Sequence, residues 1–178
     1  MLFRSKGRVY IAGESGFVHC FRADTGALIW RTFVDGREGP GGSNGAETTP
    51  AIWEDRVYVA NFSGDLFCLR ADTGAVLWKA RTGDDTDASC AVADGLVFAA
   101  SEERSPYLFA FDARSGVEKW RFGGSFARGF WATPAPAGGR VYIGAENGRM
   151  YCLDGRTGKV IWEYAAEQSI WSSPAVVD

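Results

Sequence analysis

Side chains that commonly carry out catalysis are scarce in this sequence. The chain has a single histidine, His19, and four cysteines, Cys20, Cys68, Cys90 and Cys152. The sequence contains no C-x-x-C pair, so it does not support a zinc cluster, a c-type haem site or a C-x-x-C redox motif. A Ser-His-Asp triad would need His19, which lies in the apolar run FVHCF and is interpreted as a strand residue. The cysteines are expected to be buried, free thiols.

Residues suited to binding are more frequent than residues suited to catalysis. Carboxylate and amide side chains could dock a cationic or polar partner, and an arginine could hold a carboxylate. Two tryptophans could stack on a flat ligand or a peptide, or could equally pack against a neighbouring strand. A solvated rim without function is the alternative for the acidic positions. The candidate binding residues are Glu47, Asn61, Asp87, Arg128, Trp131, Glu146 and Trp171, with Glu102 in an equivalent turn.

The composition restricts the classes of partner. The 178 residues carry a net charge of −3, which gives no basic face for nucleic acid. No apolar run approaches the roughly 18 residues of a membrane span, and the opening residues lack the apolar stretch of a signal peptide. The 23 glycines and seven tryptophans indicate short strands joined by tight turns.

An internal repeat in the sequence indicates which structural elements position the candidate residues. The segments CFRADTGALIW, CLRADTGAVLW, AFDARSGVEKW and CLDGRTGKVIW end at tryptophans spaced 48, 42 and 42 residues apart. Each is preceded by a segment of the GRVYIAG type and followed by a segment of the TPAIW type. These markers predict four short strands per period, and about 42 residues per four-stranded unit is the size of a propeller blade.

The most regular part of each period is the turn before its tryptophan. A glycine recurs four residues before the tryptophan, which predicts a backbone with positive φ. A tryptophan repeated once per blade can pack on the turn of the neighbouring blade. The residues with this expected structural role are Gly26, Trp30, Gly74, Trp78, Gly116, Trp120, Gly158 and Trp162.

The pattern A-x-D-x-x-T-G-x-x-x-W resembles the tryptophan-docking motif of the PQQ-like repeat, or quinoprotein-like, β-propellers. The third copy matches it most literally, with Ala110, Asp112, Ser115, Gly116 and Trp120. The resemblance implies an all-β propeller of four-stranded blades, with about four blades forming half or a fragment of a seven- or eight-bladed ring. The expected blades are 1–34, 47–82, 88–122 and 131–165, followed by the inner strand of a next or closing blade over 171–178.

The resemblance implies a fold more firmly than an activity. The main hypothesis is a non-catalytic scaffold without a cofactor, which binds a protein or small ligand through the loops around its central funnel. The alternative is part of a dehydrogenase that depends on PQQ and calcium, in which Glu47, Asn61 and Asp87 have suitable ligand chemistry and Trp131 or Trp171 could stack on the quinone. The partner could also be a second copy of the chain. The resemblance favours an extracytoplasmic, periplasmic location.

Overall fold

The computed structural model describes residues 7–34, 45–46, 48–83, 85–102, 106–124 and 127–177. Within these ranges the regular structure consists of fifteen β-strands and no helix, arranged as four antiparallel sheets. The strands of each sheet follow one another in the chain. Short runs of β-branched and aromatic residues separated by glycine turns favour such consecutive antiparallel strands. The expected all-β propeller architecture is confirmed. Each sheet is called a blade below, numbered in chain order.

The strand bounds repeat closely from blade to blade. Blade 1 has three strands, β1 (Arg8–Ala12), β2 (Phe17–Arg22) and β3 (Leu28–Phe33). Blade 2 has β4 (Ala51–Trp53), β5 (Arg56–Ala60), β6 (Asp65–Arg70) and β7 (Val76–Arg81). Blade 3 has β8 (Ala91–Ala93), β9 (Leu96–Ala100), β10 (Tyr107–Asp112) and β11 (Glu118–Gly123). Blade 4 has β12 (Ala135–Ala137), β13 (Arg140–Gly144), β14 (Arg149–Asp154) and β15 (Val160–Ala165).

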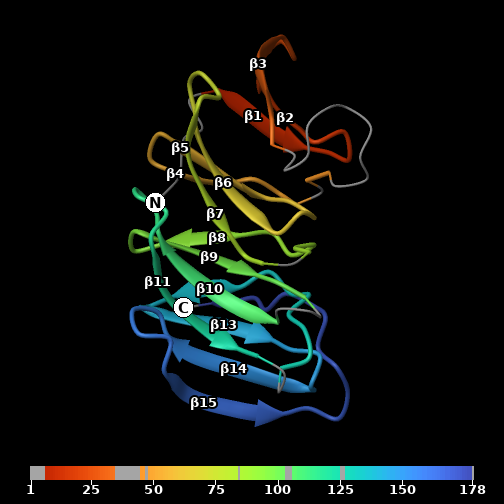
Figure 1. Ribbon diagram of the computed structural model, residues 1–178, viewed down its shortest axis with the longest axis vertical. Coiled ribbons are helices and arrows are strands. Elements are labelled where there is room, and N and C mark those ends of the chain that lie inside the picture. The colour runs from red at the N-terminus through yellow and green to blue at the C-terminus, as the bar shows by residue number, and fades with distance from the viewer. Residues whose placement is uncertain are drawn as a thin grey trace.

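The blades stack face to face along the long axis of the molecule, with blade 1 at one end and blade 4 at the other (Figure 1). The short first strands β4, β8 and β12 contact one another in series and form the inner side of this stack. The hydrophobic core lies between blades, so the second and third strands of blades 2 and 3 are buried on both faces. The last strand of each blade lies at the outside.

The turn before each tryptophan forms the joint to the neighbouring blade. The tryptophans of blades 1 to 3 each donate a hydrogen bond from Nε1 to a backbone carbonyl in the turn of the next blade. The pairs are Trp30 with Ala71 at 3.1 Å, Trp78 with Ala113 at 3.2 Å and Trp120 with Gly155 at 3.1 Å. Each indole covers a face of the turn glycine, at Gly74, Gly116 and Gly158 respectively.

These glycines are needed for two reasons. Their φ angles lie between 69° and 73°, in the left-handed region that side chains with a β-carbon disfavour. A β-carbon at Gly74, Gly116 or Gly158 would also lie 2.6–2.7 Å from the nearest indole atom. Tryptophan and glycine therefore act as a matched pair across each joint.

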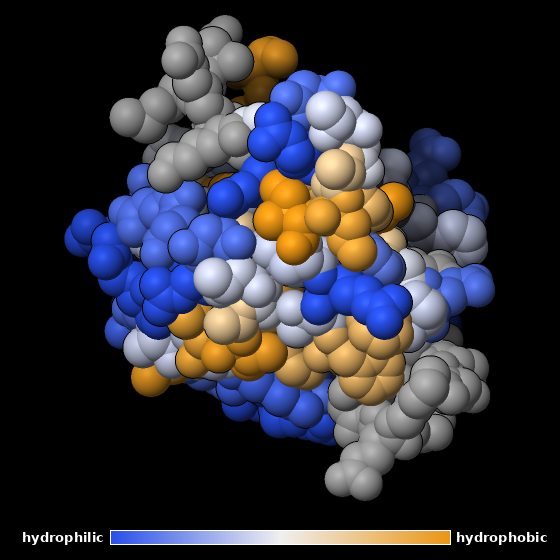
Figure 2. Space-filling model, turned by 90° about the horizontal axis from the view of Figure 1, so that it is seen from above, coloured by the Kyte–Doolittle hydropathy of each residue, from blue (hydrophilic) through white to orange (hydrophobic). Residues whose placement is uncertain are grey.

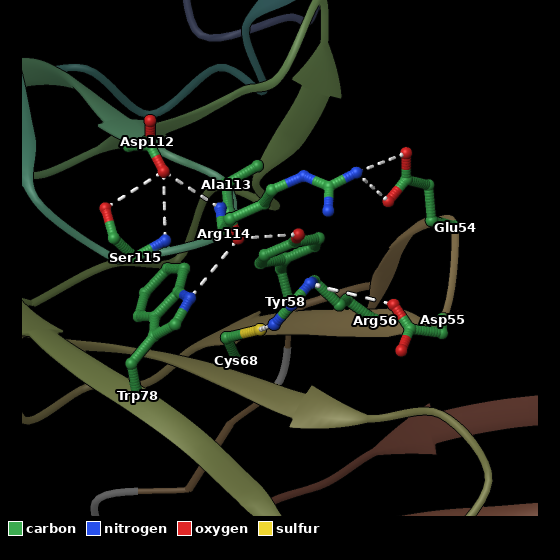
Figure 3. A network of polar contacts seen from close by, with 10 residues as sticks. All are labelled: Glu54, Asp55, Arg56, Tyr58, Cys68, Trp78, Asp112, Ala113, Arg114 and Ser115. Carbon is green, nitrogen blue, oxygen red and sulfur yellow. Dashed lines mark hydrogen bonds and ion pairs between the residues drawn. The ribbon is translucent and has the colours of Figure 1, made fainter.

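The joint between blades 2 and 3 shows how polar groups support this contact (Figure 3). The carbonyl of Ala113 accepts two hydrogen bonds, from Trp78 Nε1 at 3.2 Å and from the Tyr58 hydroxyl at 2.9 Å. On the surface beside it, Arg114 forms an ion pair with Glu54 of the preceding blade at 2.7 Å. One carbonyl is thus bonded by two side chains of the neighbouring blade.

The joint between blades 3 and 4 lacks one of these bonds because Phe98 occupies the tyrosine position. Phe98 keeps the ring contact with Trp120, at 5.9 Å between centroids, but has no hydroxyl to reach the Gly155 carbonyl. A cleft of about 620 Å³ opens at this joint, and Phe98, Gly155 and Pro136 are among its lining residues. At its turn carbonyl, this joint has one side-chain hydrogen bond fewer than the joint between blades 2 and 3.

The fourth tryptophan and the first turn glycine are not docked. Trp162 is 41% exposed, whereas Trp30 and Trp120 are 8% and 9% exposed. Gly26 has the same positive φ, 70°, but a β-carbon added there would meet no atom within 4 Å. The described residues contain no innermost strand paired with β1, and residues 171–177, where an inner strand is expected, are assigned to no strand.

Candidate binding surface at the inner loops

Two loops of each blade meet beside the inner strands and form the candidate binding surface. One loop leads into the innermost strand, and the other connects the second and third strands. Backbone hydrogen bonds join them, from Glu102 N to Asp85 O at 3.2 Å and from Glu146 N to Gly129 O at 3.0 Å. The name rim is used below for the side chains on these loops at Asp87, Glu102, Arg128, Trp131, Glu146 and Trp171.

Trp131, Glu146 and Arg128 gather around Gly129. A β-carbon at Gly129 would lie 2.9 Å from Trp131 Nε1 and 3.1 Å from Glu146 Oε2, so glycine is what allows both groups to approach the backbone. Arg128 is exposed and has a φ of 65°, a strained conformation for a residue with a side chain. Strain of this kind is common in loops that hold side chains for binding.

The indole nitrogen of Trp131 is covered but has no hydrogen-bond partner among the described residues. A buried donor left without an acceptor is destabilising by about 1–3 kcal/mol. Unsatisfied donors are rare in folded proteins, which makes this one a candidate contact for an acceptor on a bound molecule.

Glu102 is the most perturbed acid of the rim. Its side chain is only 6% exposed, and its Oε1 accepts a hydrogen bond from Asp87 N at 3.2 Å. Burial, together with the negative charges of Asp87 and Asp85, raises the pKa of Glu102 to about 8. The carboxyl is therefore mostly protonated at pH 7. Its exposed neighbour Asp87 carries the side chain that a partner can reach here.

Trp171 is the most exposed aromatic side chain of the rim, with 66% of its surface accessible. It occupies the same position in its repeat as Trp131 and Asp87, which are half-buried and exposed respectively. The nearby Ser169 hydroxyl donates to the Glu146 carbonyl at 2.7 Å, and Ile170 N donates to Ala145 O at 3.1 Å. These bonds hold the segment that carries Trp171 against blade 4.

Asn61, expected as a binding residue, is instead enclosed in the protein. Its side chain is fully buried, and its Nδ2 donates to Val34 O at 2.7 Å. Its Oδ1 accepts from Ser63 N at 3.1 Å and Asp65 N at 3.0 Å. The amide organises a turn and ties blade 2 to blade 1, so it is not available to a ligand. Glu47, the other expected residue of this region, lies outside the described residues.

Among the described residues, Asn61 is not free to join the ligands of the calcium and quinone that the resemblance would imply. Asn61 would have been one ligand, but its amide oxygen already accepts two backbone hydrogen bonds. In the part of the chain that the structure describes, no three histidine, cysteine or acidic side chains are grouped to hold a metal ion. Asn61 is thus engaged within the protein, and Glu47, another residue with suitable ligand chemistry, lies outside the described residues.

The four cysteines are free and buried. Burial raises the pKa of the Cys68 thiol to about 11 and that of Cys90 to about 12, which suppresses the reactive thiolate form. The described residues include no helix long and apolar enough to span a membrane.

Comparison with known proteins gives two groups of relatives. Residues 14–126 and 107–178 match the family model described as outer membrane protein assembly factor BamB. BamB from Escherichia coli (strain K12) is 33% identical over 95 residues, which cover 48% of this chain and 24% of that protein. Quinohemoprotein alcohol dehydrogenase ADH IIB from Pseudomonas putida is 36% identical over 84 residues, which cover 39% of this chain and 12% of that protein.

Solved structures support the same assignment. The crystal structure of BamB from Moraxella catarrhalis superposes with a TM-score of 0.77 and 25% identity, covering 95% of this chain and 49% of that one. Quinohemoprotein alcohol dehydrogenase from Comamonas testosteroni gives a TM-score of 0.71 at 20% identity, covering 92% and 34%, and shows a shared fold. This chain thus spans about half of the solved BamB. The repeated docking motif, the family match and the blade geometry show that the chain belongs to the PQQ-like repeat family of β-propellers represented by BamB.

Proposed function

We propose that this chain is a non-catalytic scaffold that binds an extended segment of another protein on its rim. The observation that carries the proposal is Trp171, a rim tryptophan with 66% of its surface exposed, on a segment bonded to the Glu146 backbone through the Ser169 hydroxyl. Large aromatic side chains supply binding area at small entropic cost, and exposed ones gather at interaction sites. Carboxylates next to an aromatic ring favour a partner that combines cationic and apolar side chains.

The polar groups of the rim suit a peptide backbone as well as its side chains. A carbonyl that reached Trp131 Nε1 would supply the acceptor that this nitrogen lacks among the described residues. Asp87 and Glu146 could pair with lysine or arginine side chains of the same segment. Arg128 limits the site by disfavouring a further positive charge beside it.

The relatives favour a protein partner over a small substrate. BamB is named as an assembly factor of outer membrane proteins, and the similarity to it covers more of this chain than the similarity to the alcohol dehydrogenase. By analogy, the proposed partner is a protein and the proposed location is extracytoplasmic. The two hydrogen bonds that the Asn61 amide oxygen already accepts favour the scaffold over the dehydrogenase.

Fluorescence anisotropy with labelled decapeptides tests the proposal. One peptide alternates lysine with phenylalanine and serine, and its counterpart has glutamate in place of lysine. We expect the lysine peptide to bind more tightly, with a preference that decreases as salt is added. Trp171→Ala should raise its Kd about tenfold.

Tyr164→Ala is the matched control for the loss of an exposed aromatic ring. Tyr164 is also 66% exposed but lies on the outer strand β15 and not on the rim loops. Equal effects of the two substitutions, or equal binding of the two peptides, would contradict the proposed site.

A further inference from the structure

The two ends of the blade stack carry the two halves of one unfilled docking joint. Blade 4 presents Trp162, whose indole is 41% exposed and has no hydrogen-bond acceptor among the described residues. Blade 1 presents the turn at Gly26, already in the left-handed conformation and with open space where an indole lies in the other three turns. In each of the three filled joints, the tryptophan of one blade lies on the turn glycine of the next, so Trp162 lacks a turn and Gly26 lacks a tryptophan.

The indole of Trp162 is already held in the orientation for docking. Its ring lies 6.0 Å from the Tyr142 ring at an interplanar angle of 48°. The docked pair Tyr58 and Trp78 has nearly the same geometry, 5.8 Å and 46°. In that joint both side chains donate to one carbonyl, so Tyr142 and Trp162 form a ready pair of donors.

The acceptor that matches this pair is the carbonyl of Ala23. Ala23 precedes Gly26 by three residues, as Ala71 precedes Gly74 and Ala113 precedes Gly116. It lines an open pocket of about 650 Å³ together with Arg8, Arg22 and Ile29. A docked tryptophan would enter this pocket.

A second open contact lies beside the unfilled docking joint, at strand β1. Val9 and Ile11 on this strand are 51% and 55% exposed, whereas the equivalent Val57 and Val59 of blade 2 are fully buried in the core shared with blade 1. The face of β1 that a neighbouring blade would cover is therefore open. Figure 2 looks onto this end of the molecule and shows hydrophobic residues gathered between hydrophilic ones. Within the described residues, no strand pairs with the free edge of β1 as β4, β8 and β12 pair with β5, β9 and β13.

The segment after blade 4 has the sequence of that missing strand. Ser173, Pro174 and Ala175 align with Thr133, Pro134 and Ala135, which lead into β12, and Val176 and Val177 are 42% and 91% exposed. By the register of β12 with β13, Ala175 would pair with Tyr10 and Val176 with Val9. A strand added to an exposed sheet edge gains backbone hydrogen bonds and covers apolar side chains.

We propose that a second copy of this chain fills both sites, so that two copies close head to tail into one ring. In each of two equivalent joints, Trp162 of one copy would enter the Ala23 and Gly26 turn of the other. Residues 174–177 of the first copy would then pair with β1 of the second. The curvature suits two copies, since this four-blade arc superposes on 49% of the BamB propeller.

Light scattering across a concentration series tests the assembly. We expect a species of twice 19.3 kDa. Trp162→Ala should weaken association roughly thirtyfold or more, as loss of a central tryptophan does at interfaces. Gly26→Asn should do the same by filling the indole site, while asparagine tolerates the positive φ of the lone turn. A chain that stays monomeric at all concentrations, or a dimer that tolerates both substitutions, would overturn the proposal.

Mixing the two variants adds a test that a folding defect cannot imitate. A mixed dimer would contain one intact joint, formed by Trp162 of the Gly26→Asn copy and Gly26 of the Trp162→Ala copy. We expect the mixture to associate more tightly than either variant alone. No gain on mixing would contradict the head-to-tail arrangement.

A disulfide reports the strand register directly. In a chain with both Val9→Cys and Val176→Cys, oxidation should form a disulfide between the two copies. The protein is kept dilute, at a concentration just high enough for the dimer to form. The single variants should not cross-link, since each lacks the opposing thiol. A link formed within one monomer, or none between copies, would refute the strand exchange.

Discussion

Truncation of Trp120 to alanine should destabilise the chain far more than the same change at Trp162, although both occupy one position of the repeat. Trp120 is 9% exposed and Trp162 is 41% exposed. The difference is about a third of a side chain that buries up to ~250 Å², or roughly 80 Å². At about 25 cal/mol per Å² this corresponds to ~2 kcal/mol.

The hydrogen bond from Trp120 to Gly155 adds about 1 kcal/mol to this difference, because Trp162 has no such acceptor among the described residues. We therefore expect losses of about 3–5 kcal/mol for Trp120→Ala and only ~1 kcal/mol for Trp162→Ala. Urea unfolding followed by far-UV circular dichroism measures both, at a concentration where the chain is monomeric. Equal losses at the two positions would refute the reasoning that docking, rather than the tryptophan itself, supplies the stability.

Three further outcomes are expected. In urea unfolding, Gly116→Ala should lower the free energy of unfolding more than Gly95→Ala, because both glycines have φ near 75° but only Gly116 faces an indole. Equal decreases would show that the clash of the alanine β-carbon with the indole does not matter. A thiol reagent at pH 8 should react slowly with the folded chain, because its four cysteines are buried and burial raises the pKa of Cys90 to about 12. After unfolding, all four thiols should react quickly. Fast reaction of the folded chain would contradict the burial of the cysteines. The wild type should lose stability as pH rises from 5 to 8, by up to about 1.4 kcal/mol per pH unit, because Glu102 has a pKa of about 8 in the folded chain and a lower one when unfolded. Glu102→Gln should remove this loss, so its stability relative to the wild type should increase with pH, whereas the control Glu146→Gln should not show this. A difference between Glu102→Gln and the wild type that is constant with pH would contradict the prediction.

The repeat made the blades and joints predictable from sequence, because strand alternation and turn glycines are local signals. The matched spacing of Gly116 and Trp120 expresses a packing rule that holds at every filled joint. The ends of the stack were less predictable, since Trp162 has the same motif as Trp120 but no neighbouring blade in this structure to dock on.

The loops that carry the candidate binding residues were predictable from the repeat, but the surroundings of each side chain were not. Asn61 has a side chain suited to ligands, yet the turn N-F-S-G that follows it is also typical of an asparagine that bonds its own loop. The burial of Glu102 could not be foreseen, because it depends on how the loop at Asp85–Asp87 folds over it. The Gly129 contact needed the geometry as well, since two loops bring Trp131 and Glu146 together.

The missing hydroxyl at Phe98 has a consequence for how the molecule opens. In a linear array each unit is held only by its neighbours, so local unfolding begins at the ends and at the weakest contact. Blade 4 is attached through the joint that lacks the tyrosine bond, and its outer strand β15 is exposed along its whole length. Amide protons of β13 and β14 should therefore exchange with solvent sooner than those of β5 and β6, and Phe98→Tyr should slow that exchange by restoring the second bond to Gly155.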